Sequence, residues 1–184
     1  GVPASLFMAI PRSLFRTLSQ HVLSPAKIVT EMNNSISDNN ESNMFVTLIV
    51  GILDLETGIL KLCNAGHNPP ILIYPDGQVS YLEFKTQIFV GVVEDFKYSD
   101  EEVVLEKESK LFLYTDGVTE AENINKELYG EEKLLEMLSD NASSDVRTTV
   151  NVVVDSIASH VKEAEASDDL TILLIQYEPG TANS

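Results

Sequence analysis

The chain has 184 residues, 43% of them hydrophobic, which is enough to bury the core of a single domain. Its formal net charge of −17, from 29 acidic and 12 basic residues, argues against nucleic acid and anionic membranes as partners. Because this charge also repels phosphorylated substrates, phosphate chemistry here would need divalent cations. The single cysteine, Cys63, excludes an internal disulfide framework and indicates a reducing compartment, so we expect a cytoplasmic protein.

Two helices are expected first. From Pro3 onward, apolar residues recur at four-residue spacing, at Leu6, Ile10, Leu14 and Leu18. Pro11 predicts a kink or a break near Ile10. Ser24 and Pro25 supply an N-cap and a first-turn proline for a second helix, whose buried stripe is expected at Ile28, Met32 and Ile36.

The middle of the chain predicts antiparallel strands. Apolar residues 45–55 and 59–63 flank a turn and predict one hairpin, and residues 70–74 and 78–83 flank Pro75-Asp76-Gly77 and predict another. Residues 103–105 and 110–114 are interpreted as a third pair. No apolar run approaches the roughly 20 residues of a membrane-spanning helix, so no membrane contact is expected.

The last part of the chain predicts two helices and one strand. Gly130 precedes a short helix with Leu134, Leu135 and Leu138, and a longer helix follows with Val150, Val154, Ile157 and Val161. Residues 170–177 are nearly all apolar, which suggests a strand buried on both faces. This order of elements favours an α+β fold of antiparallel sheets covered by helices. We expect one domain over residues 1–178 and a disordered tail over residues 179–184.

Carboxylates flank two of the apolar strands. Asp116 follows the run 111–114, and Asp168 precedes the run 170–174. If these strands are antiparallel neighbours, both carboxylates lie at one rim of a sheet, where their like charges need a cation between them. Because oxygen ligands favour hard ions, Mg²⁺ or Mn²⁺ is the expected metal.

Each motif alone has a structural interpretation. Asp116-Gly117 could be a plain turn, as we expect for Asp76-Gly77, and Asp168-Asp169 could be a loop between a helix and a strand. Only the recurrence of aspartate at the ends of two apolar strands favours a metal. A cysteine nucleophile at Cys63 is excluded, because the required arginine six positions on is Pro69.

Histidines are few. His67 lies in the sequence Asn64-Ala65-Gly66-His67-Asn68-Pro69-Pro70, which is typical of a sharp exit from a strand. His67 and Asn64 could serve that turn structurally at least as well as His67 could serve catalysis. His21 and His160 are expected to be ordinary surface or boundary residues of helices.

Five segments, in order and spacing, resemble the SpoIIE-like branch of the metal-dependent protein serine/threonine phosphatases, the bacterial relatives of the type 2C enzymes. They are Gly1-Val2-Pro3-Ala4-Ser5-Leu6-Phe7-Met8, Phe45-Val46-Thr47, and residues 64–70, 114–121 and 167–171. The resemblance implies two packed antiparallel sheets flanked by helices, in a layered α-β-β-α sandwich. It also implies a site for two Mn²⁺ or Mg²⁺ ions, whose bridging hydroxide attacks phosphoserine or phosphothreonine directly.

The resemblance assigns roles to residues. Asp116 and Asp168 match the family's metal ligands, and Gly117, Asp169, His67 and Asn64 are taken as supporting residues. The family's bridging aspartate comes from a strand and loop just before the segment that starts here at Gly1. We therefore expect this chain to lack its first strands, to bind metal weakly and to show little or no turnover. A sheet edge left open by the missing strands would favour a homodimer.

The leading hypothesis is a bacterial phosphatase domain at the output end of a longer signalling protein. By resemblance, the expected partners are an upstream sensor domain in the same protein and a phosphorylated anti-anti-sigma factor of a partner-switching pathway as substrate. The alternative is a non-catalytic interaction domain of the same fold. A separate acidic Ca²⁺-binding module is a weaker alternative, since no loop has alternating acidic ligands.

Overall fold

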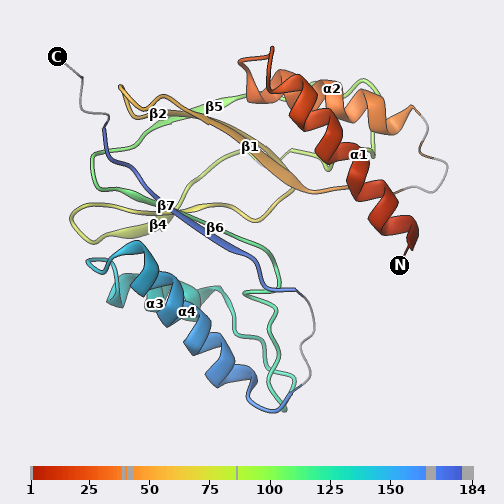
Figure 1. Cartoon of the computed structure of the whole chain (residues 1–184). Coiled ribbons are helices and arrows are strands. Elements are labelled where there is room, and N and C mark those ends of the chain that lie inside the picture. The colour runs from red at the N-terminus through yellow and green to blue at the C-terminus, as the bar shows by residue number, and fades with distance from the viewer. Residues whose placement is uncertain (1, 39, 41–43, 86, 165–168, 180–184) are drawn as a thin grey trace. The chain divides into compact units, whose positions relative to one another are not determined.

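The computed structural model describes residues 2–38, 40, 44–85, 87–164 and 169–179, with side chains from Met8 onward. Contacts divide the chain into two compact units. The first unit comprises residues 1–67 and 84–104, and the second comprises residues 68–83 and 105–184. Each unit consists of one antiparallel sheet and two helices (Figure 1). The predicted tail falls, from residue 180 on, outside the described residues.

The helices of the first unit are α1 (Val2–Leu18) and α2 (Pro25–Ser37). Of the predicted kink or break near Ile10, the break is wrong, because α1 continues through Pro11, and the kink stays a prediction. A proline removes only its own N–H from the helix, so the hydrogen bonds on either side can continue. The start of α2 is confirmed: Ser24 Oγ accepts from Lys27 N at 3.2 Å, and Pro25 occupies the first turn.

The sheet of the first unit has the strand order β1-β2-β5. The predicted hairpin is confirmed as β1 (Leu48–Leu53) and β2 (Ile59–Ala65), with β5 (Glu101–Val104) along the other edge of β2. Helix α2 packs on β1 and β2. The core that they enclose comprises Ala26, Ile28, Val29, Met32, Ile36, Val50, Cys63, Ala65, Val90 and Tyr98.

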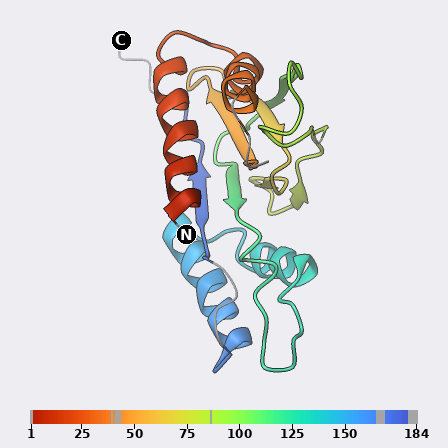
Figure 2. The same ribbon diagram turned by 90° about the vertical axis from the view of Figure 1, so that its right-hand side faces the viewer.

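The sheet of the second unit has the order β4-β3-β6-β7. The predicted hairpin around Asp76 is confirmed as β3 (Ile71–Ile73) and β4 (Val79–Tyr81). Strand β6 (Lys110–Tyr114) lies between β3 and β7 (Ile172–Gln176). Figure 2 shows β6 and β7 side by side and running in opposite directions. The sequence prediction that Asp116 and Asp168 share one rim depended on this pairing.

Two strand predictions are wrong. The predicted pair of residues 103–105 and 110–114 does not form, because β5 pairs with β2 in the first unit while β6 is a central strand of the second. The burial pattern differs accordingly, since β5 alternates between half-buried and exposed residues whereas β6 is almost wholly buried. Strand β7 is not buried on both faces: it lies at the edge of its sheet, and Leu173 and Ile175 are 54% and 40% exposed.

The helices of the second unit are α3 (Glu131–Asp140) and α4 (Val146–Val161). Helix α3 packs on β4, and α4 packs on β7. The buried stripe of α4 is Thr149, Val153 and Ile157, whereas Val154 is exposed. The core of this unit is built around Ile71, Ile73, Phe112, Tyr114, Val118, Leu134, Leu138, Val153 and Ile157.

Two antiparallel sheets with flanking helices confirm the predicted α+β fold class. None of the helices in the described part of the chain has the length and apolar character to cross a membrane. The prediction of a single domain over residues 1–178 stays a prediction.

Candidate functional site

The first candidate position is the turn that follows β6. Strand β6 ends at Tyr114, and the chain turns through residues 115–119, where Val118 N donates to Thr115 O at 3.0 Å. Asp116 is exposed, and its Oδ1 accepts from Gly117 N at 3.0 Å. No hydrogen bond to the other carboxylate oxygen is found among the described residues.

The second acidic motif reaches the same rim of the sheet. Tyr114 pairs with Ile172, and Thr115 N donates to Thr171 O at 3.1 Å. The Thr115 hydroxyl accepts from Thr171 N at 3.2 Å and donates to Asp169 O at 3.4 Å. Thr115, the residue before Asp116, thus joins the two motifs directly. The motifs meet at the end of β6 and the start of β7, as the antiparallel pairing requires.

Asp168 lies outside the described residues. Its predicted role as the partner of Asp116 therefore stays a prediction. The next residue, Asp169, is described and exposed, and its backbone contacts Thr115 at this rim.

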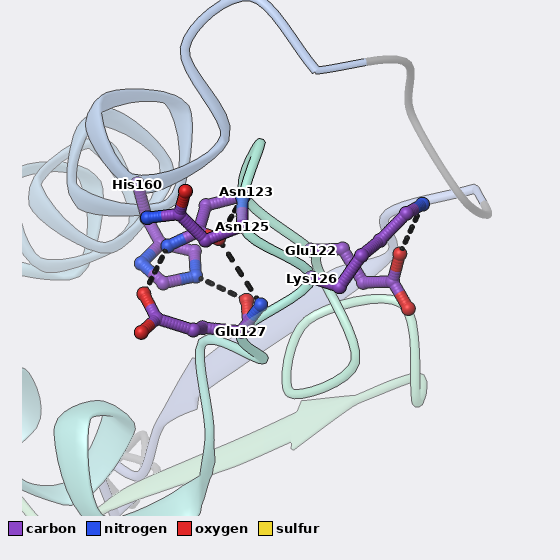
Figure 3. Close-up of polar contacts among 6 residues, drawn as sticks. All are labelled: Glu122, Asn123, Asn125, Lys126, Glu127 and His160. Atoms are coloured by element: carbon purple, nitrogen blue, oxygen red, sulfur yellow. Dashed lines mark hydrogen bonds and ion pairs between the residues drawn. The ribbon is translucent and has the colours of Figure 1, made fainter.

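The chain beyond Asp116 forms a loop that is closed by backbone hydrogen bonds. Gly130 N donates to Thr119 O and Tyr129 N donates to Ala121 O, each at 2.9 Å. At the tip, the side-chain oxygen of Asn123 accepts from Asn125 N and Glu127 N, as Figure 3 shows. An ion pair between Lys126 and Glu122, 2.8 Å long, spans the tip as well.

His160 holds this loop against α4. Its Nε2 donates to Glu127 O at 2.9 Å (Figure 3). Its ring meets the Tyr129 ring edge to face, with centroids 5.6 Å apart. His160 is half-buried, which agrees with the expectation of a boundary residue of a helix, but its role in holding the loop was not predicted. The sequence gives no signal for this role, because the acceptor is a backbone carbonyl 33 residues away.

The turn after β2, in the first unit, is the other candidate position. Asn64 is 4% exposed and uses both ends of its amide on one residue: Oδ1 accepts from His67 N at 2.8 Å, and Nδ2 donates to His67 O at 2.9 Å. Gly66 has φ = +74°, and a Cβ there would lie 1.9 Å from Cδ1 of Phe89. Asn64 and Gly66 therefore shape the strand exit.

His67 joins two of the sequence segments quoted above. Its Nδ1 lies 3.3 Å from Thr47 Oγ1, which brings the segment Phe45-Val46-Thr47 to the turn of residues 64–67. The ring is partly buried, so it is oriented by this contact and by the Asn64 hydrogen bonds to its backbone. A catalytic role for His67 stays a prediction.

The donors at the β6–β7 rim match a hard cation in kind, since they are carboxylate and carbonyl oxygens. Their number is not sufficient: across residues 2–38, 40, 44–85, 87–164 and 169–179, no group of three or more His, Cys, Asp or Glu could hold a metal ion. The predicted role of Asp116 as a metal ligand therefore stays a prediction.

Buried side chains near the two turns are poor acids and bases. Burial raises the pKa of the Cys63 thiol, next to Asn64, to about 12, so the thiol stays protonated at neutral pH. Burial also raises the pKa of Tyr114, which precedes the Asp116 turn. Cysteine or tyrosinate nucleophiles are therefore disfavoured at these two turns.

Comparisons with known proteins agree with this geometry. The family model described as Stage II sporulation protein E (SpoIIE) matches residues 1–178. The phosphoserine phosphatase RsbU of Bacillus subtilis is 24% identical over 177 residues, which cover 96% of this chain and 52% of RsbU. This chain thus spans about half the length of that relative.

Solved structures show the same fold. The SiaA-PP2C domain of Pseudomonas aeruginosa has a TM-score of 0.84 at 21% identity, covering 97% of this chain and 72% of that one. The phosphatase domain of SpoIIE from Bacillus subtilis, presoaked with Mn, has a TM-score of 0.64 at 14% identity, covering 93% of this chain and 74% of that one. At these identities the likeness establishes the PP2C-type fold.

Proposed function

Since this chain belongs to the Stage II sporulation protein E (SpoIIE) family, we propose that it is a metal-dependent protein phosphatase domain that hydrolyses phosphoserine or phosphothreonine. The observation that carries the proposal is the junction at Thr115, where the turn of Asp116 is hydrogen-bonded to residues 169 and 171. This junction brings two acidic motifs, more than fifty residues apart in sequence, to one rim of a sheet.

In this proposal Asp116 and Asp168 are metal ligands and Asp169 supports them. The ions would be Mn²⁺ or Mg²⁺, which when bound lower the pKa of a coordinated water and neutralise charge on a phosphoryl group. The strand pairing of Tyr114 with Ile172 fixes the position of the turn. Gly117 N donates to one carboxylate oxygen of Asp116 and holds that oxygen close to the backbone of the turn. The other oxygen is left for the cation. Asn64 and Gly66 shape the turn that presents His67.

The proposed substrate is a phosphorylated regulatory protein of the anti-anti-sigma type in a partner-switching pathway. RsbU, a relative over 96% of this chain, is named a phosphoserine phosphatase, which supports phosphoserine as the bond that is cleaved. An upstream sensor domain and a homodimer are part of the same proposal. The net charge of −17 fits a site that needs cations before it can accept a phosphate.

A second candidate is a non-catalytic interaction domain with this fold. One observation favours it: the described residues contain no complete set of metal-ligating side chains. The two candidates differ in whether the Asp116 turn binds a cation at all.

The test is phosphate release from a phosphoserine peptide by the natural protein that carries this chain, with Mn²⁺ and then with EDTA. The phosphatase proposal expects release that requires Mn²⁺ and that EDTA abolishes. Equal rates in Mn²⁺ and EDTA, or no release in either, would contradict it, and the interaction-domain proposal would then be favoured.

A further inference from the structure

Four apolar side chains are exposed on two segments of the first unit. Phe45, Phe89, Val92 and Val93 are 56%, 39%, 50% and 42% exposed. The segments are joined by a pair of backbone hydrogen bonds between Val46 and Val90, each 3.0 Å long. The rings of Phe45 and Phe89 stack, with centroids 5.1 Å apart and planes 25° from parallel. We call these four residues the 45/89 patch. Such clustered exposed apolar residues often mark an interaction site.

Hydrogen bonds from two asparagine side chains hold the backbone of the patch in place. The buried Asn33 of α2 accepts from Gly91 N at 2.9 Å through Oδ1 and donates to Val93 O at 2.8 Å through Nδ2. Asn40 donates to Gly91 O at 3.0 Å. Because these amides fix the backbone that carries Val92 and Val93, a partner would meet a preformed surface and would pay little ordering entropy.

Negative charge lies beside the patch. A surface hollow next to Val93 is lined by Asn34, Ser35, Asp38, Glu94 and Asp95, three of which are carboxylates. A second copy of this chain would bring the same carboxylates together in a protein whose net charge is already −17. Charge complementarity instead indicates a partner with lysine or arginine next to its apolar residues.

The patch adjoins the turn that presents His67. The Phe89 ring lies directly over Gly66, where an added Cβ would be 1.9 Å from the ring. Thr47, two residues after Phe45, lies 3.3 Å from His67 Nδ1 through its hydroxyl. A chain docked on the patch would therefore extend along the same face of the unit as the 64–67 turn.

We propose that the 45/89 patch is the docking surface for the protein substrate, and that it binds a segment in which two apolar side chains are followed by lysine or arginine. The identity of the occupant as the substrate rests on the proposed phosphatase function. The apolar pair would cover the stacked rings of Phe45 and Phe89, and the cations would face Glu94 and Asp95.

The test is fluorescence anisotropy with two labelled phosphoserine peptides that differ only in having Phe-Leu-Arg-Arg or Phe-Leu-Glu-Glu at one end. We expect the arginine peptide to bind at least about tenfold more tightly. The variants Phe45→Ser and Glu94→Lys should each remove most of this preference. Leu23→Ser, which alters a side chain that is 83% exposed elsewhere in the same unit, is the matched control and should bind like the wild type. Equal binding of both peptides, or unchanged binding by Phe45→Ser and Glu94→Lys, would overturn the proposal.

Phosphate release from the same two peptides by the natural protein separates this inference from the proposed function. Selective binding without any Mn²⁺-dependent release would support the docking surface and overturn the phosphatase activity. Release at equal rates from both peptides, with unselective binding, would support the activity and overturn the docking surface.

Discussion

The two strand exits, after β2 in the first unit and after β6 in the second, each have a polar residue near a glycine, but the polar side chains make different contacts. Each places a polar residue at or next to a strand end with a glycine close by. Asn64 is buried and uses both its amide oxygen and its amide nitrogen on the backbone of His67. Asp116 is exposed, and the carboxylate contact found for it within the described residues is the one with Gly117 N. The first exit is closed by its own side chain, whereas the second exposes a carboxylate to solvent.

The difference separates structural from functional polar residues. A polar side chain whose donors and acceptors are all used within a turn stabilises that turn. A carboxylate with unused capacity, at a rim shared with a second acidic motif, can bind a cation. Substitutions at the first exit should therefore reduce stability, and substitutions at the second should reduce activity.

The largest effect is expected for Asp116→Asn. Loss of a ligand charge should lower Mn²⁺-dependent phosphate release by the natural protein at least about 100-fold, since even residues that only support metal ligands contribute 10- to 100-fold. The melting temperature should change little because the side chain is exposed. Asp76→Asn is the matched control, since Asp76 also precedes a glycine at a turn, and it should retain full activity. Equal activity of Asp116→Asn and Asp76→Asn would refute a functional role for the Asp116 turn.

Gly66→Ala should be the most destabilising change at the first exit. The added Cβ would meet the Phe89 ring at 1.9 Å, and alanine would be strained at φ = +74°. We expect a loss of about 2–4 kcal/mol in the free energy of unfolding, measured by urea denaturation. Gly77→Ala is the control, because φ is +89° there but the nearest atom is 3.9 Å away. A loss at Gly66 no larger than that at Gly77 would contradict the packing against Phe89.

Asn64→Ala should cost about 1–3 kcal/mol of unfolding free energy, because both backbone groups of His67 lose their partners. Asn125→Ala, on an exposed loop, should cost less than about 0.5 kcal/mol. Chemical denaturation of the two variants side by side measures the difference. If Asn64→Ala left stability intact and abolished activity, Asn64 would belong to the catalytic machinery.

The smallest effect concerns Cys63 and appears only at high pH. Burial raises the thiol pKa from its ordinary value to about 12 in the folded protein. Stability from the protonated thiol is thus fully present below about pH 9 and is lost as pH rises toward 12. Between pH 9 and 11, the unfolding free energy of the wild type should fall more steeply than that of Cys63→Ala. Parallel slopes would show that the thiol is not protected at the end of β2.

Local patterns predicted much of the fold. The cap at Ser24 and the Asp76-Gly77 hairpin follow from residues close in sequence, and the structure has both. Pairing between strands that are far apart in sequence was harder to predict. Residues 101–104 and 110–114 are close in sequence but lie in different sheets. The burial patterns of these two strands differ, but the sequence alone did not show that only β6 lies in the middle of a sheet.

Local sequence patterns likewise identified only part of the candidate site. Asp116 was chosen because an aspartate buried at the end of an apolar strand would need a partner, whereas the structure places this carboxylate in solvent, so its predicted role does not follow from burial. His160 was missed because it contacts a backbone carbonyl of the loop, and a carbonyl has no residue type to recognise. The exposed face of β7 was missed because an apolar edge strand and a doubly buried strand have similar composition.

The most direct test of the central claim is Mn²⁺ anomalous diffraction from crystals of the natural protein that carries this chain. We expect a Mn²⁺ peak within about 2.5 Å of a carboxylate oxygen of Asp116, a distance typical of cation–oxygen ligation. Ordered Mn²⁺ found only at other positions, with the Asp116 turn well defined, would contradict it.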